Sequence, residues 1–260
     1  MPPPPLLWVC VAAALLRLSS GLATVPSVVR VGRFEVLAVD EEQQQQQQQP
    51  ADKRGDSTTS RIFLQDVSSG WGNGQHPTTK LCMQFIHDNV KSGDVVLDYG
   101  TGSGVLSLLS KALGARKCVA VDIDEDSLRA AERNAQLNGW RTPDDIDVIH
   151  TKYIYLGNDR IPIADVAVAN ILPGPLTRLV APLWGLTKPG GLLCLSGMRP
   201  AELPAVRAAY SPFVDLSTER VCEEGHASFG QWVSWAVRFK EMGDEERRAA
   251  RTRLMEQAMG

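Results

Sequence analysis

The stretch "VLDYGTGSG", residues Val96 to Gly104, decides the fold that we expect for this chain. A short apolar strand leads into a glycine-rich turn, and the apolar helix pattern "SGVLSLLSKALG" begins at that turn. Glycine lets the backbone adopt turn conformations and lets its N–H groups come close to a ligand. The stretch therefore predicts the first strand–helix unit of a parallel sheet, with a ligand site at the carboxyl end of the strand.

The segments around this unit show the same alternation of strands and helices. A helix beginning at Pro77 is expected at "HPTTKLCMQFIHDNV". Further strands are expected at "KCVAVDID", "IDVIHTK", "ADVAVAN" and "GGLLCLSGM", and further helices at "EDSLRAAERNAQLNG", "PGPLTRLVAPLWGLT" and "AELPAVRAAY". The last strands, "FVDLSTERVC" and "FGQWVSWAVRFK", have a short connection. This order predicts an α/β fold: a mostly parallel sheet with helices on both faces and an antiparallel C-terminal edge.

Composition narrows the class of protein. The chain has 260 residues, is 43% hydrophobic and carries a formal net charge of -3. That is enough apolar material for one substantial core, and the scattered basic residues form no footprint for nucleic acid. Five cysteines are present without a C-x-x-C pair, so we expect buried small hydrophobes and no metal site.

The N-terminal segment differs in kind from the rest. It has an apolar run from Leu6 to Leu16 and a small-residue stretch after Arg17. The run is shorter than the roughly 20 apolar residues that a membrane-spanning helix needs. We expect residues 1–26 to be a presequence, either for an organelle (plastid or mitochondrion) or for secretion, and we expect no membrane span in the mature chain.

Two acidic residues accompany the glycine turn. Asp98 stands two residues before Gly100, and Asp122 ends the next strand, where it could accept hydrogen bonds from both ribose hydroxyls of a nucleoside. The spacing from Gly100 through Gly102 to Gly104 is G-x-G-x-G, whereas dinucleotide sites use G-x-G-x-x-G to receive a pyrophosphate. An acid at this turn suits a cationic ligand with a free amino group. The pattern favours S-adenosylmethionine over NAD, FAD or a purely structural turn.

Asn170 ends the strand "ADVAVAN", at the same predicted edge of the sheet. Methyl transfer to an amine is an in-line displacement, in which positioning supplies much of the catalysis. The side-chain carbonyl of Asn170 could accept an N–H bond from the amine and leave its lone pair directed at the methyl carbon. The alternative is that Asn170 only caps the turn that Pro173 and Pro175 shape.

With these residues in place, the chain resembles the PrmA-type methyltransferases of ribosomal protein L11. The resemblance runs from about Arg30 to Lys240 through "GWGNGQHPTT", "VLDYGTGSG", "AVDIDEDSLRAAERNAQLNG", "DVAVANILPGPL" and "KPGGLLCLSGM". It implies a seven-stranded, Rossmann-like class I methyltransferase fold and S-adenosylmethionine-dependent methylation of lysine and N-terminal amines. In that family the glycine loop and the H-P-T-T segment close over the methionine end of the cofactor. By matching position, the resemblance implies the cofactor contacts Thr79, Gly100, Asp122 and Asn170, to which the turn adds Asp98 and Gly102.

The resemblance also suggests a domain division. We expect linker strands at 27–70 around a disordered glutamine-rich loop at 41–60, a methyltransferase domain at 71–240 and a charged C-terminal helix at 241–260. Family members carry a small substrate-recognition domain ahead of the linker, and we expect it to be absent here. Trp71 replaces the family's phenylalanine and could anchor a partner or pack beneath the cofactor loop.

The substrate is therefore less defined than the chemistry. Ribosomal protein L11 is the first expectation, with Asn170 as the catalytic residue. The alternatives are another organellar protein, such as electron-transfer flavoprotein beta subunit, and a cofactor-binding interaction module without turnover. His76 could act as a base, although a histidine before a proline at a helix start is more often structural.

Overall fold

The computed structural model describes residues 28–39, 60–65, 74–154, 161–243, 245–247 and 249–250. The expected presequence, the glutamine-rich loop and Trp71 lie outside these residues. The described elements run in the order β1 Val28–Val31, β2 Phe34–Val39, β3 Ser60–Gln65, α3 Pro77–Asn89, β4 Val95–Tyr99, α4 Val105–Ala112, β5 Lys117–Asp122, α5 Glu125–Leu137, β6 Ile146–His150, the 3-10 helix η2 Thr151–Tyr153, β7 Ala164–Asn170, α6 Pro173–Leu176, α7 Val180–Gly185, β8 Thr187–Met198, the 3-10 helix η3 Pro200–Glu202, α8 Leu203–Tyr210, β9 Val214–His226 and β10 Gly230–Phe239.

The main sheet has seven strands in the order β6-β5-β4-β7-β8-β10-β9. Strands β4 to β8 pair in parallel, and β10 is antiparallel to both β8 and β9. The predicted mostly parallel sheet with an antiparallel C-terminal edge is confirmed. The chain builds outward from β4 to β6 on one side and from β7 onward on the other, so the topological switch point lies between β4 and β7.

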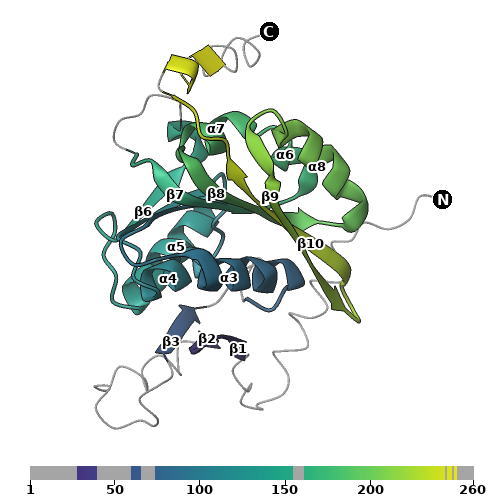
Figure 1. Ribbon diagram of the computed structural model, residues 1–260. Helices are drawn as coiled ribbons and strands as arrows, with labels where there is room; N and C mark the ends of the chain where they lie inside the picture. The colour runs from purple at the N-terminus through teal and green to yellow at the C-terminus, as the bar shows by residue number, and fades with distance from the viewer. Residues whose placement is uncertain are drawn as a thin grey trace, which may run out of the picture.

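Helices cover both faces of this sheet (Figure 1). In β4, Val95 and Leu97 belong to the core beneath α6, α7 and α8, whereas Val96 belongs to the core shared with α3 and α4. Successive side chains of a strand point to opposite faces, so each strand must be apolar on both. This explains why the strands read as continuous apolar runs, and it places Asp98 on the same face as Val96.

The helix expected across "PGPLTRLVAPLWGLT" is two short helices, α6 and α7, so that part of the prediction is wrong. Pro182 explains the break, because its ring lacks an N–H and clashes with the carbonyl of the residue four positions earlier in a continuous helix. A new helix beginning at Val180 places Pro182 in its first turn, where no intrahelical donor is needed. Pro204 lies at the start of α8 for the same reason.

Two predicted helix starts are confirmed, and the tail is partly visible. Pro77 is in the first turn of α3, and Asp124 caps α5 by accepting from the N–H groups of Asp126 and Ser127. In the C-terminal segment, residues 245–247 and 249–250 are helical. Among the helices that the structure describes, none combines the length and apolar character needed to cross a bilayer.

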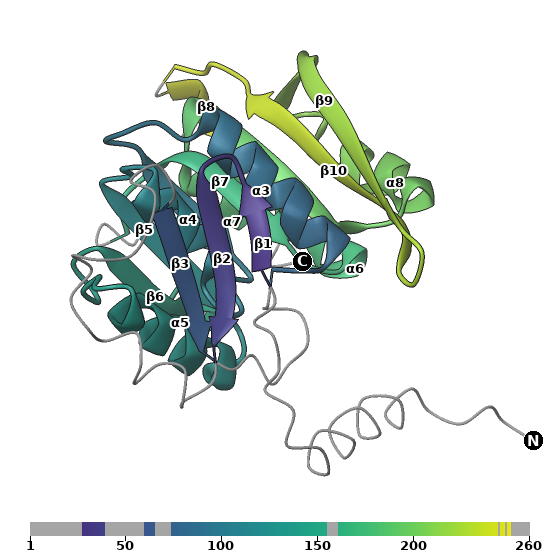
Figure 2. The ribbon, with the colours of Figure 1, turned by 90° about the horizontal axis from the view of Figure 1, so that it is seen from below.

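The linker strands form a separate sheet in the order β1-β2-β3. β1 and β2 are an antiparallel hairpin, and β2 and β3 are parallel. This sheet lies against the outer side of the α3, α4 and α5 layer (Figure 2). Asn138 donates to the carbonyl of Phe63 at 2.7 Å and accepts from its N–H at 2.9 Å, and Asn134 accepts from the N–H of Gln65 at 2.7 Å. Side chains of α5 and of its C-cap residue thus provide hydrogen-bond partners for the outer edge of β3.

Candidate active site

The glycine turn lies at the carboxyl end of β4, beside the switch point. Gly100, Gly102 and Gly104 have φ angles of 82°, 55° and 83°. Side chains beyond glycine rarely adopt such angles, so the sequence pattern has a direct backbone cause. Asn134 donates to the carbonyl of Ser103 at 2.8 Å and so connects the turn to α5. The turn thus presents its backbone on one side, and the hydrogen bond from Asn134 fixes it to α5 on the other.

Asp98 lies beneath the turn. One of its carboxylate oxygens, Oδ2, accepts hydrogen bonds from the hydroxyls of Thr101 at 2.7 Å and Ser107 at 2.8 Å and from the N–H of Ser107 at 3.2 Å. The side chain is fully buried. Its other oxygen, Oδ1, is the one buried side-chain polar atom in the described residues without a hydrogen-bond partner. Asp98 therefore positions the turn, and its contact with a cofactor amino group stays a prediction.

Burial raises the pKa of Asp98 from the ordinary 3.8 to about 6, although its hydrogen bonds oppose the shift. An acid with a raised folded-state pKa binds its proton more tightly in the folded chain, so its stabilising contribution is present below pH 3.8 and is lost as pH rises through about 6. The shift corresponds to about 3 kcal/mol of unfolding free energy. A cost of that size in the unliganded protein is typical of a functional site.

We therefore expect Asp98→Asn to stabilise the unliganded protein at neutral pH. The amide oxygen can replace Oδ2 as an acceptor without a buried charge, so the unfolding free energy at pH 7.5 should rise by about 1–3 kcal/mol. At pH 4 the two proteins should be nearly equal, because Asp98 is then mostly protonated. Urea unfolding from pH 4 to 8 measures both curves. Parallel curves would contradict the assignment of the raised pKa to Asp98.

Asp122 ends β5 beside the turn. Its Oδ2 accepts from the N–H of Gly102 at 2.9 Å, and its Oδ1 accepts from the N–H groups of Ile123 at 2.8 Å and Asp124 at 3.0 Å. The side chain is half-buried, and Ile123 beside it is 74% exposed. A carboxylate has about four acceptor positions. One or more of them is left for the hydroxyls of a ribose, and the exposed Ile123 offers an apolar surface next to it.

These features fit S-adenosylmethionine. The positive-φ glycines leave room for a ligand against the backbone, the orphaned Oδ1 of Asp98 lies under the turn, and Asp122 stands at the end of the neighbouring strand. Gly100, Gly102 and Asp122 would hold the nucleoside and amino acid portions of the cofactor. The residues that sequence patterns predicted as cofactor contacts thus gather at one edge.

The role of Asp122 leads to a binding prediction. Charge-assisted hydrogen bonds contribute about 1.5–3 kcal/mol each, so Asp122→Ala should weaken S-adenosylmethionine binding at least about tenfold. Titration calorimetry measures the affinity, and thermal melting shows whether the variant is folded. Equal affinity in the folded variant and the wild type would remove Asp122 from the cofactor site.

Asn170 and Thr79 meet across the switch point. Asn170 is the last residue of β7, and its Nδ2 donates to the hydroxyl of Thr79 in the first turn of α3 at 3.2 Å. Thr79 is buried and Asn170 is half-buried. The helix that follows is capped by Leu172 without a side-chain hydrogen bond. The side chain of Asn170 therefore does not cap this helix, and the catalytic role of its carbonyl oxygen stays a prediction.

Two glycines fix the residue after Asn170. A Cβ atom on Gly100 would overlap the side chain of Ile171, and one on Gly197 would overlap its carbonyl oxygen and lie 2.7 Å from its carbonyl carbon. Ile171 also donates its N–H to the carbonyl of Ser196 at 3.2 Å. Ile171 thus connects the cofactor turn to the end of β8. Its side chain lies against Gly100 and its backbone against Gly197, which restricts the position of the neighbouring Asn170.

His76 is part of a cluster that sequence reasoning missed. Its Nδ1 lies 2.7 Å from the hydroxyl of Thr78, and its ring packs on Phe229 and Trp232 at centroid distances of 5.1 and 4.8 Å. The Arg199 guanidinium lies 3.9 Å from the Trp232 ring centroid. Burial and the Arg199 charge lower the pKa of His76. His76 therefore caps α3 and joins it to the β9–β10 hairpin, a long-range contact that no local pattern reveals.

The described cysteines differ in their exposure. Cys82, Cys118 and Cys194 are buried, as expected for small hydrophobes, whereas Cys222 is exposed. Within the described ranges, no group of three histidine, cysteine, aspartate or glutamate side chains could hold a metal ion.

The sheet order, the glycine turn and the paired Asn170 and Thr79 define a class I methyltransferase. The model of the ribosomal protein L11 methyltransferase (PrmA) family matches residues 51–235. The chain therefore belongs to the PrmA family of S-adenosylmethionine-dependent methyltransferases. This membership and the sheet confirm the family and the fold expected from the sequence.

Individual relatives agree with the family assignment. The ribosomal protein L11 methyltransferase of Pseudomonas aeruginosa is 44% identical over 159 residues, which cover 59% of this chain and 50% of that protein. The Cupriavidus metallidurans enzyme is 39% identical over 164 residues, or 63% of this chain and 51% of that protein. This chain spans about half the length of these curated relatives. The crystal structure of the ribosomal protein L11 methylase from Lactobacillus delbrueckii subsp. bulgaricus superposes with a TM-score of 0.61 at 27% identity, covering 82% of this chain and 99% of that chain.

Proposed function

We propose that this chain transfers methyl groups from S-adenosylmethionine to lysine side chains, and to the N-terminal amine, of ribosomal protein L11. The observation that supports this most directly is the contact between Asn170 and Thr79, at the edge that also holds the glycine turn and Asp122. The curated relatives are named for the same substrate. If residues 1–26 are a presequence for an organelle and not for secretion, the substrate would be an organellar L11 protein.

The described residues suggest how the reaction is organised. When bound, S-adenosylmethionine supplies an electrophilic methyl group on a sulfonium. Thr79 holds the amide of Asn170 through Nδ2, so the Asn170 carbonyl can accept an N–H bond from the substrate amine and aim its lone pair. Asn170 would hold the neutral form of the amine for methylation, and the methylated ammonium product would release a proton to solvent. His76 is engaged as the α3 cap, so we assign it no proton transfer.

The test is methylation by the purified protein with radiolabelled S-adenosylmethionine. Purified L11 and an organelle extract are offered in parallel, and labelled proteins are identified by mass spectrometry. Label in L11 lysines supports the proposal. Label only in another protein, such as electron-transfer flavoprotein beta subunit, would keep the chemistry and replace the substrate. Cofactor binding without any label would indicate an interaction module.

A further inference from the structure

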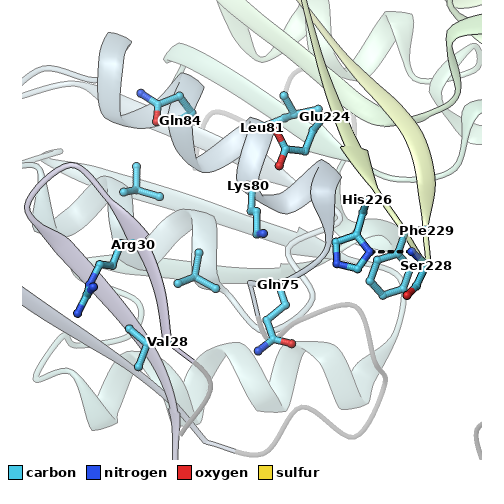
Figure 3. A pocket seen from close by; sticks show the side chains of 12 residues that line it. Val28, Arg30, Gln75, Lys80, Leu81, Gln84, Glu224, His226, Ser228 and Phe229 are labelled. Atoms are coloured by element: carbon cyan, nitrogen blue, oxygen red, sulfur yellow. Dashed lines mark hydrogen bonds between the residues drawn. The ribbon is translucent and has the colours of Figure 1, made fainter.

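A groove of about 650 Å³ runs beside the active site, between the two sheets (Figure 3). All of β1 lines one wall, and the end of β9 with the β9–β10 hairpin lines the other, including Glu224 and Phe229. Lys80 and Gln84 of α3 lie between these walls. The groove therefore has a strand on one side, a hairpin on the other and a helix between them.

The β1 wall is the free edge of its sheet. Among the described strands, β1 pairs only with β2, and the other edge of the sheet, that of β3, is occupied by Asn134 of α5 and by Asn138, the C-cap of α5. The hairpin has a two-residue turn, Gly32 and Arg33, which makes Val31 and Phe34 its hydrogen-bonded closing pair. Hydrogen-bonded and non-hydrogen-bonded pairs alternate along an antiparallel ladder. The N–H and carbonyl of Arg30 consequently face away from β2, where a further strand could pair.

Two charged side chains in the groove, Lys80 and Glu224, have no partner among the residues that the structure describes. Arg30 is neutralised by Glu35, with their side chains 2.9 Å apart. By contrast, the described residues include no hydrogen-bond or ion-pair partner for the side chains of Lys80 or Glu224. The two lie on different elements, one on α3 and one on β9. A ligand with an acidic group near Lys80 and a basic group near Glu224 would match this arrangement.

The groove and the transfer site share the first turns of α3. Thr79 points to Asn170 from the first turn of α3, and the next residue, Lys80, lines the groove. The hairpin residue Phe229, also in the groove, packs on His76 at the start of the same helix. A segment bound in the groove would therefore lie beside the helix turn that presents Thr79 to Asn170.

We propose that this groove binds an extended segment of the protein substrate, which adds to β1 as a further strand. Main-chain hydrogen bonds to β1 would supply affinity, and Lys80 and Glu224 would select side chains of opposite charge. A lysine just beyond the segment would then reach Asn170. The identity of the partner as a methylated protein rests on the proposed function, whereas the groove and its strand-like ligand do not.

The free edge is tested with Arg30→Pro against Arg30→Ala. Both remove the side chain and its ion pair, but only proline removes the N–H that faces the groove, and an edge strand tolerates it there. We expect Arg30→Pro to raise the KM for L11 about tenfold with kcat nearly unchanged. Arg30→Ala should stay within about twofold of the wild type, since exposed ion pairs contribute little. Equal KM values in the two folded variants would overturn strand addition.

The charges are tested with Glu224→Lys against Glu223→Lys. The two substitutions change the charge equally at neighbouring positions of β9. The Glu223 side chain, however, points to the other face of the strand and accepts a hydrogen bond from Gln231 at 2.8 Å. Glu224→Lys should raise the KM about tenfold, and Glu223→Lys should leave it within about twofold. Equal effects of the two substitutions on KM would overturn the proposed contact between Glu224 and a basic group of the bound segment. Thermal melting and S-adenosylmethionine affinity confirm that each variant is folded.

A binding measurement separates the groove from the proposed function. The probe is a fluorescent ten-residue peptide whose outward positions alternate between lysine and glutamate and whose other positions are valine or threonine. Saturable binding that weakens about tenfold in Glu224→Lys and Arg30→Pro, but not in the two control variants, supports the groove even if L11 is never methylated. No saturable binding at millimolar peptide overturns it. A change of oligomeric state in Arg30→Pro, or tighter peptide binding after removal of residues 1–26, would assign the edge to a second copy or to the chain itself and overturn the proposal too.

Discussion

Gly197→Ala should both destabilise the protein and strongly reduce methyl transfer. The new Cβ would overlap the carbonyl oxygen of Ile171, and the three atoms nearest to it all belong to the Ile171 backbone, so rotation of a side chain cannot relieve the overlap. Gly197 also has a φ of 92°, which costs a residue with a side chain about 1–3 kcal/mol. With the overlap added, we expect the unfolding free energy to fall by about 3 kcal/mol or more. Displacement of Ile171 moves Asn170, and a misplacement of about 1 Å can reduce turnover about 100-fold.

Gly139→Ala provides the matched control. Gly139 has a φ of 80°, and an added Cβ would meet nothing within 4 Å. This variant carries the backbone strain without the overlap and lies outside the site, so we expect a loss of about 1 kcal/mol and wild-type turnover. Urea unfolding and the radiolabel assay compare the two variants. Equal losses of unfolding free energy and turnover in the two variants would show that the close approach of Gly197 to Ile171 does not cause the effect of Gly197→Ala.

This contact shows where sequence reasoning stops. Gly197 lies within the pattern "GGLLCLSGM", which correctly predicts a strand because its apolar run and length are local features. Its close approach to Ile171 depends on β7 and β8 being neighbours, which is a property of the sheet order. The cluster around His76 is hidden for the same reason, since Phe229 and Trp232 come from the distant hairpin.

The candidate site was more accessible to sequence reasoning than these contacts. In a parallel sheet, residues that end different strands meet at one edge whatever the strand order. Asp122 and Asn170 could therefore be placed together from their positions at strand ends, and Gly100 from its turn. Asp98 shows the limit: its position before the turn was clear, but its burial beneath the turn depends on the hydroxyls of Thr101 and Ser107 folding back on it.

Asn170→Ala should reduce turnover far more than it weakens cofactor binding. If the Asn170 carbonyl orients the amine mainly in the transition state, its loss appears in kcat, which we expect to fall about 100-fold or more. Affinity for S-adenosylmethionine should change less than about tenfold, because Asp122 and the glycine turn remain. Single-turnover kinetics and calorimetry measure the two quantities separately. A fall in affinity that matches the fall in turnover would make Asn170 a binding residue only.

Substitutions of Thr79 test whether turnover depends on the orientation of the Asn170 side chain as well as on its presence. The Thr79 hydroxyl accepts the bond from Nδ2 of Asn170, so Thr79→Val removes the anchor in a nearly equal volume and leaves the amide free to rotate. We expect kcat to fall about tenfold, less than in Asn170→Ala, because some molecules still present the carbonyl correctly. Thr79→Ser keeps the hydroxyl and should retain turnover within about threefold. Thr79→Val in an Asn170→Ala background should then have almost no further effect, because the two residues act as one unit. Additive losses would show instead that Thr79 acts independently of Asn170, for example by contacting the cofactor directly.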